Sequence, residues 1–72
     1  MTTDEVRTII KDCILKTAIS TMTNQEALDI LNAIDVNSID VDEFHTKTIN
    51  DLNSYIQTLT LVIEDQELPP DE

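Results

Sequence analysis

The feature that most constrains this chain is the absence of glycine over its whole length of 72 residues. Its two prolines, Pro69 and Pro70, stand together near the C-terminus. Proline and glycine are the residues that break or weaken a helix from within, so nothing before them interrupts a helix by backbone chemistry. Tight turns between β-strands, in contrast, usually need glycine. The sequence therefore predicts an all-α fold.

Three short motifs predict where the helices begin. In a capping box, a Ser, Thr or Asp side chain accepts a hydrogen bond from the first turn, and a Glu three residues later accepts one from the backbone of the cap. The pairs with this spacing are Thr2 and Glu5, Thr23 and Glu26, and Asp40 and Glu43. Each pair opens a run of apolar residues at helical spacing. We expect a small bundle of three helices at about residues 3–20, 24–34 and 41–65.

A chain of this size forms one small domain, which we place at residues 1–65, followed by an acidic flexible tail at residues 66–72. Such a domain buries only about 60% of the surface that its unfolded chain exposes, so it is marginally stable alone. Cys13 and His45 are the only cysteine and histidine, which excludes an intrachain disulfide and a zinc site closed by four N or S ligands. We expect a buried Cys13, no cofactor and no metal, and stabilisation by helix packing or oligomerisation.

The third predicted helix carries a heptad pattern. Its apolar positions, spaced 3, 4, 3 and 4 residues apart, are Ile49, Leu52, Ile56, Leu59 and Ile63. Isoleucine at a positions with leucine at d positions favours a two-stranded parallel coiled coil. No charged residue occurs from Leu52 to Ile63, although an exposed helix face ordinarily carries charged residues. We therefore predict that these five residues form an oligomer or partner seam, with a homodimer favoured, and that the first two helices cover another face.

Residues 55–63 also permit a strand interpretation, because they are rich in β-branched side chains and partly alternate. The chain offers no second strand with which such a segment could pair. The length and the period of the apolar pattern favour a helix here.

The formal net charge is −11, and the only cations are Arg7, Lys11, Lys16 and Lys47. Binding to phosphate groups needs clustered Lys and Arg, so we expect neither nucleic acid nor an anionic membrane as a partner. A protein with a basic surface is the natural partner for this charge. No apolar run is long enough to span a membrane, and the N-terminus does not resemble a signal peptide. We expect a cytoplasmic protein, or one of the host cytoplasm if a virus encodes it.

The acidic stretch at residues 34–44, IDVNSIDVDEF, is the first candidate site. A calcium loop would need oxygen ligands at its positions 1, 3 and 5, Gly at 6 and Glu at 12, and both possible registers fail. The simpler interpretation is a corner between two helices. In this interpretation Asn37 ends the second helix, because Asn tolerates the left-handed conformation, and Asp40 caps the third.

One alternative gives this stretch a function. The sequence Asn37-Ser38-Ile39-Asp40, followed by Glu43, resembles the Asp-Ser-Leu segment of acyl carrier proteins. The resemblance implies that Ser38, at the start of a helix, carries phosphopantetheine, and that the acidic residues after it dock basic enzymes. The chain has Asn37 where that family has Asp, and no glycine before the serine.

Nothing in the sequence assembles a catalytic site. His45 has no nucleophile or orienting partner that the pattern brings to it, and a chain without glycine has no glycine-rich phosphate loop. We therefore expect no enzyme, and predict a small acidic helical protein that binds and inhibits or scaffolds another protein. One form of this function is a virus-encoded inhibitor of a host enzyme, for example from a phage. The alternatives are the carrier domain modified at Ser38, a structural subunit of a larger assembly, and a small-molecule binder formed between subunits.

Overall fold

The computed structural model describes residues 1–67, which form three α-helices and one short 3-10 turn and contain no strand. The helices are α1 (Thr3–Ala18), α2 (Asn24–Asn32) and α3 (His45–Glu67), and the turn η1 (Val36–Ser38) lies between α2 and α3. The prediction of an all-α fold is confirmed for this part of the chain. Residues 55–63 are helical, so the strand interpretation is wrong.

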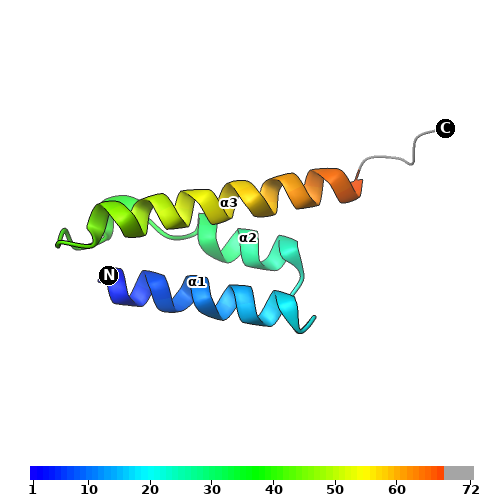
Figure 1. Cartoon of the computed structure of the whole chain (residues 1–72), viewed down its shortest axis with the longest axis horizontal. Helices are drawn as coiled ribbons and strands as arrows, with labels where there is room; N and C mark the ends of the chain where they lie inside the picture. Colours follow the sequence, from blue (N-terminus) through cyan, green and yellow to red (C-terminus); the bar gives the residue numbers. More distant parts are fainter. Residues whose placement is uncertain (68–72) are drawn as a thin grey trace.

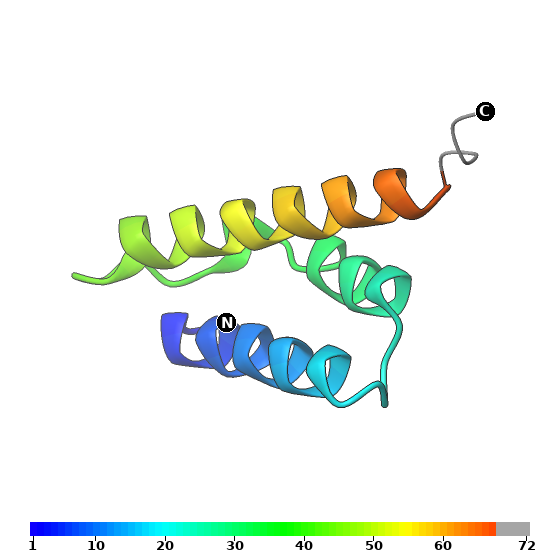
Figure 2. The same ribbon diagram turned by 45° about the vertical axis from the view of Figure 1, so that its right-hand side comes forward.

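The three helices form an up-down-up arrangement. Figures 1 and 2 both show α1 and α3 running in the same direction, while α2 runs back against them. One cluster of buried apolar side chains joins the helices: Val6, Ile10, Cys13, Ala27, Leu31, Ile39, Leu52 and Leu59. Apolar residues of each predicted helix therefore meet in a single core. Ile14, Ile19 and Ile30 of the same apolar runs are nevertheless 40% or more exposed.

Two of the three predicted capping boxes form. The hydroxyl of Thr2 accepts from the backbone N–H of Glu5 at 3.2 Å, and the Glu5 carboxylate accepts from the N–H of Thr2 at 2.9 Å. Thr23 and Glu26 repeat this pair of bonds at 3.0 and 2.9 Å. Because the backbone N–H donated by each threonine stabilises the ionised carboxylate, the pKa values of both glutamates lie below the ordinary value. These local interactions place the starts of α1 and α2 where the sequence predicts them.

The first two helices are each two residues shorter than predicted. Helix α1 ends at Ala18, and Ser20 then adopts a left-handed backbone with φ of 63°. The N–H groups of Thr21 and Met22 both donate to the carbonyl of Lys16, at 2.9 and 3.2 Å, which closes the turn. Helix α2 ends at Asn32 with Ala33 as its C-cap, so the prediction that Asn37 ends this helix is wrong. Asn37 lies within η1 instead.

The predicted capping box at Asp40 and Glu43 is wrong, because α3 begins only at His45. The segment before it instead lies against the N-terminal end of α1. The N–H of Asp40 donates to the carbonyl of Met1 at 2.7 Å, and the Thr3 hydroxyl donates to the Asp42 carboxylate at 2.8 Å. Ile39 is buried in the core beside these bonds. A helix starting at residue 41 would break this tertiary anchor.

At its other end α3 runs to Glu67, two residues beyond the predicted limit. The expected flexible tail at residues 66–72 therefore overlaps the last helical residues. Its remainder, 68–72, lies outside the described residues.

Candidate partner-binding groove

The predicted seam on α3 faces the chain's own core. Leu52 is 1% exposed and Leu59 is also buried, while Ile49 and Ile56 are partly buried against the same cluster. Ile63, near the end of α3, is half-buried. The two leucines present no surface to a second chain unless the bundle opens. Within this chain, the two leucines of the heptad pack in the core that α3 shares with α1 and α2.

Ser38 does not occupy the position that the carrier resemblance implies. It is the last residue of η1, and its hydroxyl donates to the carbonyl of Asp35 at 2.8 Å. An extended segment follows it, and α3 begins only at His45. The side chain is exposed, yet it is not placed at the start of a helix.

The other candidate chemical groups also lie apart from any assembled site. Cys13 is buried, as predicted, and burial raises the pKa of its thiol, with the neighbouring Asp12 carboxylate adding to the effect. His45 is half-buried at the first residue of α3. Within residues 1–67, no three His, Cys, Asp or Glu side chains gather closely enough to hold a metal ion.

The structure contains a groove that the sequence does not predict. It lies between α1 and α3, has a volume of about 400 Å³ and opens to solvent. The α1 wall and the α3 wall each consist of pairs one helical turn apart: Arg7 and Lys11, Ile10 and Ile14, Asp51 and Tyr55, and Ser54 and Thr58. We call these eight residues the α1–α3 groove. None of them belongs to α2. Helix α2 contacts both α1 and α3, and the groove lies on the side of this pair that α2 does not cover.

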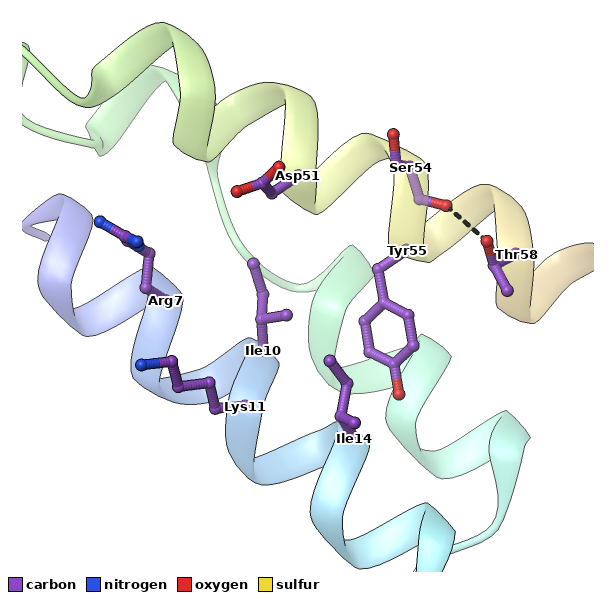
Figure 3. A pocket seen from close by; sticks show the side chains of 8 residues that line it. All are labelled: Arg7, Ile10, Lys11, Ile14, Asp51, Ser54, Tyr55 and Thr58. Carbon is purple, nitrogen blue, oxygen red and sulfur yellow. Dashed lines mark hydrogen bonds between the residues drawn. The ribbon is translucent and has the colours of Figure 1, made fainter.

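The floor of the groove is apolar. Figure 3 shows the Tyr55 ring projecting from α3 toward Ile14 of α1, with Ile10 further along the same wall. Ile10 belongs to the buried core, whereas Ile14 is 48% exposed. The core of the bundle therefore continues to the surface here instead of ending under polar side chains.

The rims of the groove differ in charge. Arg7 and Lys11 line the α1 side, and the Arg7 guanidinium lies 5.8 Å from the centre of the Phe44 ring. On the α3 side the Asp51 carboxylate pairs with Lys47, one turn earlier on the same helix, at 2.9 Å. The Thr58 hydroxyl donates to the carbonyl of Ser54 at 3.0 Å, as the dashed line in Figure 3 shows. The groove thus combines an apolar floor with a cationic rim on α1.

Two signals in the sequence pointed toward this groove. Arg7 and Lys11 are four residues apart in the first predicted helix, which places both on one face of it. The uncharged run from Leu52 to Ile63 includes Ser54 and Thr58, which line the groove and are exposed. The sequence alone could not show that these two faces lie opposite each other.

A scan of the chain against protein-family models, curated proteins and solved structures finds no match. In the part of the chain that the structure describes, no helix has the length and apolar character needed to cross a membrane. The function must therefore be argued from the site itself.

Proposed function

We propose that this chain is a small interaction protein that docks a helical segment of another protein in the α1–α3 groove and thereby inhibits or scaffolds that protein. The observation that carries the proposal is the apolar floor of the groove, where Ile14 and Tyr55 connect the core to the surface. Amphipathic helices commonly bind in such grooves by laying their apolar face on the floor.

The lengths of the helices support this mode of binding. Helix α2 has 9 residues, against 16 in α1 and 23 in α3, so it can cover only part of the long pair. A helix placed on the open side of α1 and α3 would complete a four-helix arrangement, in which side chains from all four helices share one core. The partner would then supply the burial that this small chain lacks.

The acidic surface supports a second contact with the same partner. Two hydrogen bonds, from Asp40 to Met1 and from Thr3 to Asp42, bring the acidic corner at residues 40–43 beside the first turn of α1. This turn is also acidic, since it contains Asp4 and Glu5. A concentration of one sign of charge speeds the approach of a protein with the opposite charge. We therefore keep the proposal that the partner carries a basic surface beyond its docking segment.

The experiment that tests the proposal is capture of the partner from the cell that makes this protein, with paired variants. Ile14→Asp places a charge on the floor of the groove, whereas Leu15→Asp places the same charge on the neighbouring side chain, which is 58% exposed and does not line it. We expect Ile14→Asp to lose a partner that both the wild-type protein and Leu15→Asp retain, with unchanged helical circular dichroism. Equal capture by the two variants would contradict docking in the groove.

The remaining candidate functions are tested by other variants and measurements. A carrier domain would lose function on Ser38→Ala, which leaves the groove untouched. A structural subunit or a homodimer would form an assembly larger than one chain, and native mass spectrometry measures the mass of that assembly. A virus-encoded inhibitor of a host enzyme is the form of the leading proposal in which the captured protein is an enzyme.

A further inference from the structure

We infer that the segment bound in the α1–α3 groove is an amphipathic helix with carboxylates along one edge, which pair with Arg7 and Lys11. This inference rests on the proposed function of the groove as a docking site. Two features of the groove select such a partner, namely its apolar floor and its cationic rim.

The distribution of charge is the first argument. The chain has 15 acidic and 4 basic side chains, and two of the four cations line this one groove. The two lysines outside it form ion pairs, Lys16 with Asp12 at 3.0 Å and Lys47 with Asp51 at 2.9 Å. Among the described residues, Arg7 and Lys11 form none. Among the lysine and arginine side chains within residues 1–67, the two without a carboxylate partner therefore lie together at the groove.

The carboxylate of the groove itself does not neutralise them. Asp51 lies on the opposite wall, but its carboxylate already accepts from Lys47 on its own helix. The net charge contributed by the three charged lining residues is therefore positive, at +2 − 1 = +1. An anion from outside is the group that complements this rim.

The geometry of the rim favours anions on a helix. Arg7 and Lys11 are four residues apart on α1, which corresponds to a rise of about 6 Å. Carboxylates at positions i and i+4 of a docked helix have the same spacing. The contact between Arg7 and the Phe44 ring restrains the guanidinium beside the groove, which lowers the entropy lost when a carboxylate binds.

The length of the groove fits the same partner. From Arg7 to Ile14, and from Asp51 to Thr58, each wall rises by about 10 Å, or two helical turns. A helix of two to three turns would place apolar residues at i, i+3, i+4 and i+7 on the floor made by Ile10, Ile14 and Tyr55. On the far wall Ser54 and Thr58 are small enough to permit close approach of the helix backbone.

Two designed peptides test the inference. Both are helical and about three turns long, with the same leucine stripe, and one carries Glu at i and i+4 along one edge where the other carries Lys. We expect the Glu peptide to bind the full chain at least tenfold more tightly than the Lys peptide at low salt, as measured by calorimetry. We expect Arg7→Gln combined with Lys11→Gln to weaken the Glu peptide by about tenfold and to remove most of its salt dependence.

The control variant is Lys16→Gln, since Lys16 lies on the same helix but outside the groove. It should leave the affinity of the Glu peptide within about twofold. Equal binding of the two peptides, no binding of either, or no effect of the double variant would each overturn the inference. A fall in the native mass of the double variant without any peptide would also overturn it, because the occupant would then be a second copy of this chain.

These outcomes are distinguishable from failure of the proposed function. If Ile14→Asp loses the captured partner while the Glu and Lys peptides bind with equal affinity, the groove is the docking site. Only the charge assigned to the partner is then wrong. If Ile14→Asp and Leu15→Asp capture the partner equally, the groove is not the docking site, whatever the peptides do.

Discussion

At the scale of single residues, Thr48 carries a buried polar group that lacks a hydrogen bond. Its side chain is 0% exposed, and its hydroxyl has no hydrogen-bond partner among the described residues. A buried hydroxyl without a partner costs about 1–3 kcal/mol of stability, because it loses its bonds to water. The shape of Thr48 suits the core of the bundle, whereas its polarity does not.

We predict that Thr48→Val stabilises the protein by about 1 kcal/mol, since valine has the same shape without the unpaired hydroxyl. Urea unfolding followed by circular dichroism measures the change. Thr60→Val is the matched control on the same helix, because the Thr60 hydroxyl donates to the carbonyl of Ile56 at 2.8 Å and should give no such gain. A less stable Thr48→Val variant would show that the hydroxyl has a partner, such as an internal water.

Ser20 has a backbone conformation that is unfavourable for a residue of its type. Its φ of 63° lies in the left-handed region, which costs a residue with a Cβ atom roughly 1 kcal/mol or more. In a chain without glycine, serine takes the position that glycine commonly fills at the end of a helix.

We predict that Ser20→Gly raises the free energy of unfolding by about 0.5 kcal/mol, after part of the gain is lost to the greater freedom of glycine in the unfolded chain. Ser20→Ala keeps the Cβ atom and should show no gain. If both variants shift the urea midpoint equally, the backbone strain at this position is not the cause.

At the scale of elements, α3 organises the molecule. Its heptad leucines, Leu52 and Leu59, are buried in the core shared with α1 and α2. Leu61 lies outside this core and is 57% exposed. The same residue type on the same helix therefore has two very different environments. The burial of Leu52 and Leu59 predicts that these positions matter for stability more than Leu61 does.

We predict that Leu52→Ala lowers stability by about 2–5 kcal/mol, through lost burial and the cavity left behind, which is enough to unfold much of a domain this small. Leu61→Ala should change stability by less than about 0.5 kcal/mol. Thermal unfolding compares the two variants. If Leu52→Ala stayed folded and only its native mass fell, the seam would be an interface between chains after all.

At the scale of the whole molecule, the net charge of −11 opposes compaction. Folding gathers Asp4, Glu5, Asp40 and Asp42 at one end of the bundle. Like charges gathered at one end repel one another. Salt weakens this repulsion, with a screening length of about 10 Å at 0.1 M.

We predict that sodium chloride raises the urea midpoint of this protein between low and moderate salt. Glu43→Gln removes one exposed carboxylate from the acidic corner and should raise the midpoint at low salt while reducing the effect of added salt. A midpoint that falls as salt is added would mean that attractive ion pairs, and not repulsion, dominate the electrostatics of the folded state.

The sequence by itself determined the class of fold, the number of helices in the described chain and the starts of α1 and α2. The reason is that capping and helical propensity act between residues three or four positions apart, as in the bonds of Thr2 with Glu5 and of Thr23 with Glu26. The burial of Cys13 followed from the same local period.

The tertiary structure alone decided the start of α3 and the existence of the groove. The bond from Thr3 to Asp42 spans 39 positions, and it outweighed a local capping motif that had the correct spacing. The groove depends on the two long helices lying side by side with only the 9-residue α2 to cover them. A one-dimensional pattern shows which face of each helix is apolar, but the distance between two faces is set by packing of the whole molecule.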